Sequence, residues 1–170
     1  FFSDERAVPP DHQDSNYGLA RRLLLEPLGI SGSVVHRMRG EASDLAAEAA
    51  RYEAEMRQAL GTPTGAKPVF DLILLGMGED GHTASLFPGN ETGEWEDRDV
   101  LAQGVPAGGA RRLSFSLELI NRSRIVLFLV TGERKREMVK KVLSPEGMPY
   151  IPPAARVAGR RTIWVLDEAA

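Results

Sequence analysis

The sequence predicts an α/β protein built on a mostly parallel, open sheet with helices on both faces. Short apolar runs that suit strands alternate along the chain with segments that suit helices, which is the pattern of βα units. The run at 72–75 is Leu-Ile-Leu-Leu, and we expect a strand covered on both faces, as in a parallel sheet. A glycine-rich, polar stretch follows it directly. Ligands of such sheets bind at the carboxyl ends of strands, so a binding site is expected there.

The first half of the chain contains four expected elements. Residues 1–3 suit the end of a strand, and a polar loop marked by prolines follows at 4–15. Ser15 is a good N-cap for a helix that reaches about Glu26, before Pro27 and Gly29. Residues 34–38 are a strand candidate. A second helix is expected over 43–60, where one face carries Leu45, Ala49, Tyr52, Met56 and Leu60.

The second half begins with a connection at 61–68, rich in glycine and proline, that leads into the strand at 70–75. Residues 91–110 are polar and glycine-rich and are expected to form a long surface loop. Strands are expected at 112–116, 125–130 and 162–166, and a charged helix at 133–143. With 170 residues and no internal repeat, a single domain is expected.

Composition narrows the possible functions. A net charge of −3 without a basic run argues against a nucleic-acid or membrane-surface partner, and no apolar stretch approaches the roughly 20 residues of a membrane span. The chain has no cysteine, which excludes disulfides and thiolate chemistry and fits a reducing, cytoplasmic compartment. His12, His36 and His82 lack metalloprotease spacing, so no metal site is predicted.

The glycine-rich stretch 76–81, Gly-Met-Gly-Glu-Asp-Gly, matches the dinucleotide pattern GxGxxG. That pattern requires a helix that opens at the turn, but Pro88 and Gly89 stop any long helix here. We therefore do not predict a nicotinamide or flavin site. Gly76, Gly78 and Gly81 could instead let backbone amides approach a ligand oxygen closely.

A histidine beside two carboxylates follows the same strand. His82 comes after Glu79 and Asp80, and an imidazole at a strand's carboxyl end suits a general base. Most single histidines are structural, so from the residues alone both interpretations of His82 stay open. Arg112 and Lys135 each suit surface charges when considered alone, but together they suit a phosphorylated small molecule.

Five stretches of the chain resemble 6-phosphogluconolactonases, in the order in which that family carries them. They are FFSDERAVPPDHQDSNY (1–17), LLGMGEDGHTASLFPG (74–89), RRLSFS (111–116), VTGERK (130–135) and WVLDEAA (164–170). Family members carry Arg-Ile-Thr where this chain has Arg-Leu-Ser at 112–114, which leaves the arginine in place. The family also begins with a strand, a phosphate-binding Ser-Gly-Gly loop and a helix ahead of FFSDER. We therefore expect residues 1–170 to be one α/β domain that lacks this N-terminal portion.

The resemblance implies a Rossmann-like sugar-phosphate isomerase/lactonase fold and hydrolysis of 6-phospho-D-glucono-1,5-lactone in the oxidative pentose phosphate pathway. It implies no cofactor and no metal, and the oligomeric state stays open. One alternative is a glucosamine-6-phosphate deaminase on the same scaffold. That family typically carries DEY where this chain has Asp4-Glu5-Arg6, and GHIAFNEP where it has GHTASLFP at 81–88. A non-catalytic sugar-phosphate-binding protein is the third alternative.

The expected catalytic group is His82 as general base, with Asp4, or less favourably Asp80, orienting its imidazole. Arg6 is expected to face the carbonyl oxygen or the sugar hydroxyls. The remaining expected contacts serve the substrate: amides of Gly76, Gly78 and Gly81 for the oxyanion, Arg112 and Lys135 for the phosphate, and Ser15 and Asn16 for the far side of the pocket.

Overall fold

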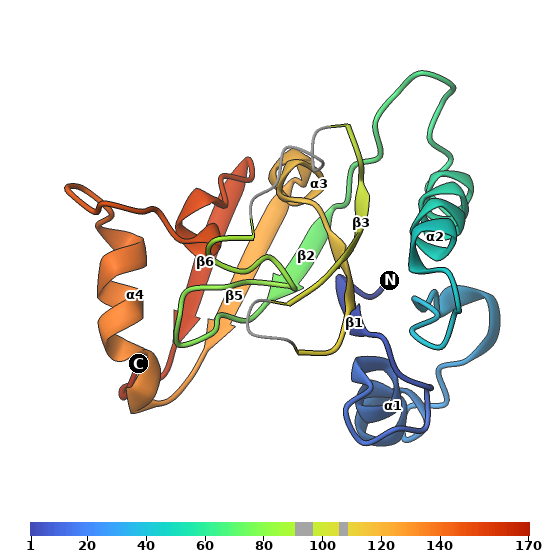
Figure 1. Cartoon of the computed structure of the whole chain (residues 1–170), viewed down its shortest axis with the longest axis horizontal. Helices are drawn as coiled ribbons and strands as arrows, with labels where there is room; N and C mark the ends of the chain where they lie inside the picture. The colour runs from blue at the N-terminus through green and yellow to red at the C-terminus, as the bar shows by residue number, and fades with distance from the viewer. Residues whose placement is uncertain (91–96, 106–108) are drawn as a thin grey trace.

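The computed structural model describes residues 1–90, 97–105 and 109–170, and its strands form two three-stranded sheets (Figure 1). The parallel sheet has the order β2-β5-β6, with β2 at Leu72–Leu75, β5 at Ile125–Val130 and β6 at Arg161–Leu166. The second sheet is antiparallel, with the order β1-β4-β3. It comprises Asp4–Arg6 (β1), Arg112–Phe115 (β4) and Val100–Gln103 (β3). The α/β class is confirmed, but the strands are not mostly parallel.

The helices follow the sequence pattern closely. α1 (Asn16–Ala20) begins after Ser15, whose hydroxyl accepts a hydrogen bond from Gly18 N, and continues as a π-helical turn, η1 (Arg21–Leu25). α2 (Leu45–Ala59) begins at the N-cap Asp44. α4 (Arg136–Leu143) follows the 3₁₀ turn η5 (Glu133–Lys135). In Figure 1, α4 lies on the β6 side of the molecule, whereas α1 and α2 lie beyond β1.

Three local expectations need correction, and one short helix was not expected. The strand expected at 1–3 begins only at Asp4, although Ser3 O already accepts a hydrogen bond from Phe115 N of the neighbouring strand. Residues 34–38 form no strand, because the 3₁₀ turn η2 (Gly32–Val34) leads into irregular chain. The expected loop at 91–110 contains β3. The short helix α3 (Leu117–Arg122) was not expected, since six residues are too few to show a helical period. The 3₁₀ turn η6 (Pro153–Arg156) precedes β6.

The hydrophobic core lies against one face of the parallel sheet only. Ile73 and Leu75 of β2 are buried, but Leu72 and Leu74 are 49% and 64% exposed. Leu129 of β5 is 60% exposed on the neighbouring strand. The expectation that the 72–75 strand is covered on both faces is therefore wrong for the described chain: its burial alternates as in a sheet with one open face.

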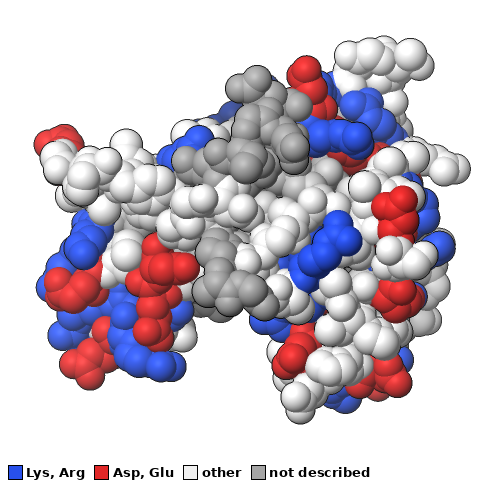
Figure 2. All heavy atoms as spheres, viewed as in Figure 1, with Lys and Arg blue, Asp and Glu red and all other residues white. Residues whose placement is uncertain are grey.

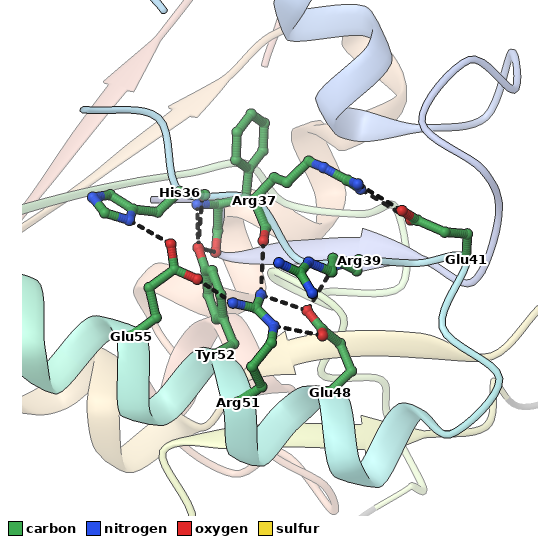
Figure 3. Close-up of polar contacts among 9 residues, drawn as sticks. His36, Arg37, Arg39, Glu41, Glu48, Arg51, Tyr52 and Glu55 are labelled. Atoms are coloured by element: carbon green, nitrogen blue, oxygen red, sulfur yellow. Dashed lines mark hydrogen bonds and ion pairs between the residues drawn. The ribbon is translucent and has the colours of Figure 1, made fainter. Parts of the chain in front are cut away.

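Helix α2 is attached to the segment 36–41 by charged and polar side chains (Figure 3). Arg51 pairs with Glu48 and Glu55, and Glu55 also accepts from His36 Nδ1 at 2.7 Å. The Tyr52 hydroxyl is buried beneath this network and donates to His36 O at 3.0 Å. Burial raises the pKa of Tyr52 well above its usual value, so this hydroxyl stays a donor. The network therefore has a structural role, which is to hold α2 against the segment 36–41.

The surface in the view of Figure 2 mixes charges of both signs, most densely over α4. No helix among the described residues has the length and apolar character needed to cross a bilayer.

Candidate active site

A cavity of about 460 Å³ opens where β2 ends. Its walls come from three segments that are far apart in sequence: the first strand with the start of α1, the loop after β2, and the turn before α4. Seven of the eleven predicted site residues line it, namely Asp4, Arg6, Asn16, Gly76, Gly78, His82 and Lys135. The other four, Ser15, Asp80, Gly81 and Arg112, are not in the lining.

The loop after β2 is a tight turn that carries His82 back over the end of the strand. Gly78 N donates to His82 O at 2.8 Å, and Gly81 N donates to Gly78 O at 3.1 Å. Gly81 has a φ of 82°, which favours glycine. No helix opens between residues 76 and 89, so the structural context of a dinucleotide fingerprint is absent.

The hydrogen bonds within this turn involve two of the three glycine amides that were expected to stabilise the oxyanion. The amides of Gly78 and Gly81 are both used within the turn, and His82 N donates to Asp80 Oδ1 at 3.1 Å. These amides therefore do not serve a ligand in this conformation. Gly78 and Gly81 are required for a different reason, because side chains approach both positions closely.

His82 and Asp80 form a hydrogen-bonded pair directly over Gly78. His82 Nδ1 lies 2.6 Å from Asp80 Oδ1, and a Cβ at position 78 would lie only 2.1 Å from that nitrogen. Partial burial alone would raise the pKa of Asp80, but hydrogen bonds from the backbone and ring of His82 outweigh it and lower the pKa below its usual value. The carboxylate thus stays charged and holds Nδ1, which leaves Nε2 as the free basic nitrogen.

Asp4 has a different partner from the one we favoured. Its Oδ2 accepts a hydrogen bond from Ser85 Oγ at 2.8 Å, and Ser85 is itself fully buried, with its amide donating to Ser114 Oγ at 3.1 Å. The preference for Asp4 over Asp80 as the partner of the imidazole is therefore not supported by the hydrogen bonds. Asp4 instead presents a fixed carboxylate at the cavity wall.

Two arginines meet on adjacent strands near this wall. Arg6 and Arg112 are register partners in the β1–β4 pair, and neither forms an ion pair with a carboxylate within the described residues. Arg6 donates to Asp14 O at 2.6 Å, while the Nε atoms of both arginines are buried without a partner. Burial, and next the charge of Arg6, lower the pKa of Arg112. The negative charge of a bound anion would offset both effects.

Lys135 adds a further cation to the cavity lining, from the turn before α4. Its Nζ donates to Met77 O at 2.9 Å, which draws the side chain from the turn before α4 onto the loop after β2. An ammonium group has two further protons for a ligand oxygen. The lining therefore combines a carboxylate-oriented imidazole with cations from separate elements.

Ser15 and Asn16, although adjacent in sequence, have different roles. Asn16 lines the cavity, and its Nδ2 donates to Asp4 O at 3.1 Å. Ser15 caps α1, is 1% exposed and donates to Glu5 Oε2 at 3.0 Å. Glu5 itself was not among the residues that the sequence predicted for the site. The period of two in a strand could have placed it on the buried side, between Asp4 and Arg6.

Comparisons with known proteins agree with this architecture. The family model described as glucosamine-6-phosphate isomerases/6-phosphogluconolactonase matches residues 1–164. A 6-phosphogluconolactonase of Synechocystis is 40% identical over 171 residues, covering 100% of this chain and 70% of its own length.

Two solved structures share the fold. The 6-phosphogluconolactonase of Thermotoga maritima superposes with a TM-score of 0.80 at 32% identity, covering 96% of this chain and 70% of that one. A monomeric glucosamine-6-phosphate deaminase superposes with a TM-score of 0.72 at 25% identity, covering 98% of this chain and 71% of that one. The chain belongs to the family of glucosamine-6-phosphate isomerases and 6-phosphogluconolactonases.

Proposed function

We propose that this protein hydrolyses 6-phospho-D-glucono-1,5-lactone to 6-phospho-D-gluconate. The observation that carries the proposal is the imidazole of His82, which lines the cavity while Asp80 holds its Nδ1. The name of the Synechocystis relative, 6-phosphogluconolactonase, supports the same substrate. A lactone carbonyl is already electrophilic, so the enzyme needs mainly to activate water and to orient the substrate.

The reaction follows from the free nitrogen of His82. Nε2 takes a proton from a water molecule as the water oxygen bonds to C1 of the lactone. The tetrahedral intermediate then collapses, the bond between C1 and the ring oxygen breaks, and the imidazolium returns the proton to that oxygen. The product is an open-chain acid, which loses its carboxyl proton to solvent. Acid–base help of this kind contributes about 10²–10⁴-fold to the rate.

Other residues of the lining, together with Arg112 beside it, bind and orient the lactone. Arg6 faces the developing negative charge on the carbonyl oxygen or the sugar hydroxyls, and Asp4 accepts hydrogen bonds from hydroxyl groups. Asn16 contributes from the far side of the cavity. Arg112, next to Arg6, and Lys135 bind the phosphate with charge-assisted hydrogen bonds. The unpartnered Nε and the lowered pKa of Arg112 support this assignment.

Deamination of glucosamine 6-phosphate is the second candidate, because a deaminase shares the fold at 25% identity. The sequence departs from the deaminase pattern at both quoted motifs, with Arg6 in place of tyrosine and Phe87 in place of glutamate. A binding protein without activity is the third candidate, and the oriented imidazole argues against it.

A side-by-side assay of the protein and its His82→Gln variant on both substrates tests the proposal. We expect saturable hydrolysis of the phosphorylated lactone above the spontaneous rate and no ammonia release from glucosamine 6-phosphate. The variant should lose at least about 10²-fold in kcat with little change in KM. Near-native turnover by the variant would overturn the role of His82, and activity on glucosamine 6-phosphate alone would overturn the substrate.

A further inference from the structure

The ring of Phe87 contacts two of the groups assigned to the reaction. Its centroid lies 4.6 Å from that of the His82 imidazole, with the two planes inclined by 37°. Arg112 Cζ lies 5.9 Å from the same phenyl centroid. Phe87 is 9% exposed and is absent from the cavity lining. One largely buried ring thus joins the loop after β2 to the first residue of β4.

The backbone just before Phe87 is held firmly. Leu86 N donates to Thr83 O at 2.9 Å in an isolated bridge between these two residues, and Thr83 Oγ1 donates to Gly76 O at 2.8 Å. The Leu86 side chain is completely buried in the core. The phenyl ring therefore leaves the chain from a fixed point and can support the groups packed against it.

Arg112 depends on such support more than a surface arginine would. Its side chain makes no hydrogen bond or ion pair within the described residues, and its Nε is buried. A guanidinium within about 6 Å of an aromatic centroid is attracted to the ring face. Packing against Phe87 is thus a specific contact that limits where the Arg112 charge can lie.

We propose that Phe87 is a positioning residue that fixes the distance between the imidazole of His82 and the guanidinium of Arg112. The inference rests on the proposed function. The lactone carries its phosphate on C6 and its reacting carbonyl at C1, so one substrate molecule must reach both groups at once. A fixed spacing orients the carbonyl toward His82 whenever the phosphate is bound. Unphosphorylated gluconolactone uses only the imidazole end and gains nothing from that spacing.

Steady-state kinetics of Phe87 variants on the two lactones test this. Phe87→Leu removes the ring, Phe87→Tyr keeps it, and Phe70→Leu is the matched control, because Phe70 is a similarly buried aromatic that packs on Phe1 and Phe115. We expect Phe87→Leu to lower the ratio of kcat/KM for phosphorylated over unphosphorylated lactone on the order of tenfold, the size of one cation–π contact. Phe87→Tyr and Phe70→Leu should keep the ratio of the unmodified protein.

Four other outcomes are informative. Equal losses on both lactones in Phe87→Leu, or a changed ratio in Phe70→Leu, would show a general packing role and overturn the proposal. If Phe87→Leu does not fold, Phe87→Met fills more of the space and is held to the same expectation. Failure of the unmodified protein to hydrolyse the phosphorylated lactone refutes the proposed function instead, so the two failures are distinguishable.

Discussion

At the scale of single residues, the candidate chemistry rests on two side chains in one turn. Asp80 and His82 are only two positions apart, and their pairing requires that position 78 carry no side chain. The turn thus places a carboxylate, an imidazole and a glycine within contact of one another. Because Asp80 and His82 are close in sequence, few rotatable bonds lie between them, and their pairing costs little conformational entropy.

Replacement of Asp80 by asparagine should impair catalysis without changing substrate binding. An amide can present its NH₂ to Nδ1 and so favour the wrong tautomer, as in other carboxylate–histidine pairs. We expect kcat to fall on the order of 10²-fold with KM nearly unchanged, measured by initial rates on the phosphorylated lactone. Glu79→Gln is the control, since Glu79 pairs with the exposed Arg134 and should stay within about twofold. Similar rates for both variants would contradict the assigned role of Asp80.

The glycines of the turn should differ sharply in their tolerance of alanine. In Gly78→Ala the new Cβ would overlap His82 Nδ1 and lie 2.5 Å from Asp80 Oδ1, whereas at Gly76 the nearest atom is Leu129 O at 4.0 Å. We expect the loss of kcat in Gly78→Ala to exceed that in Gly76→Ala by at least about tenfold, because misplacement of catalytic groups by 1 Å can cost about 10²-fold. Equal losses would show that steric room above Gly78 is not what the pair requires. Thermal unfolding of both variants separates this effect from loss of fold.

At the scale of elements, one buried carboxylate joins the first strand to the first helix. Glu5 is 2% exposed. Its Oε1 accepts from the amides of Arg6 and Asn16 at 2.8 Å each, and its Oε2 accepts from Tyr17 N and Ser15 Oγ. The negative charge also lies at the positive end of α1. Three cavity residues, Asp4, Arg6 and Asn16, are thereby held by a residue that does not reach the cavity.

Glu5→Gln should therefore be strongly destabilising. The amide keeps one acceptor but turns its NH₂ toward Tyr17 N and the Ser15 hydroxyl, so the hydrogen bond from Tyr17 N is lost and the remaining buried donors no longer face a negative charge. We expect unfolding by urea to show a loss of about 3 kcal/mol. Glu26→Gln is the control, because Glu26 forms an exposed pair with Arg21 and should change stability by less than about 0.5 kcal/mol. A Glu5 variant as stable as the Glu26 variant would contradict this account of the β1–α1 junction.

At the scale of the whole molecule, the two faces of the parallel sheet differ. Val126 and Phe128 of β5 are fully buried, whereas Leu129 on the other face is largely exposed. Exposed leucines on adjacent strands form an apolar surface, and such surfaces favour association. The same alternation explains why β2 has Leu72 and Leu74 on one side and Ile73 and Leu75 on the other.

A pair of threonine substitutions in β5 tests this asymmetry in the 170-residue chain. Leu129→Thr should change the free energy of unfolding by less than about 0.5 kcal/mol and should reduce self-association in sedimentation velocity. Val126→Thr places a hydroxyl in the core and should cost about 1–3 kcal/mol. Comparable destabilisation by both substitutions would show that the Leu129 face is covered in solution.

The sequence by itself determined the elements that depend on local interactions. The run before Gly76, the N-cap at Ser15 and the helical stripe of α2 each depend on residues within a few positions, and strands and helices formed there. The same holds for the site turn, in which glycines, an acid and a histidine lie within seven residues. Family-specific stretches such as 1–17 and 74–89 also pointed to the correct family.

The tertiary structure alone determined the strands and side-chain contacts that depend on residues far apart in sequence. β3 forms because Val100–Gln103 finds β4 as an antiparallel neighbour, a pairing with no signal in its own polar flanks. Glu5 is buried where the start of α1 brings three donors to it, and Asp4 binds Ser85, 81 positions away, rather than His82. The imidazole of His82 pairs with Asp80 rather than with Asp4 because the Asp80 carboxylate lies within hydrogen-bonding distance of Nδ1. Hydrophobic patterns and turn signals in a sequence do not give the distance between two side chains, because that distance depends on how the side chains pack in the folded protein.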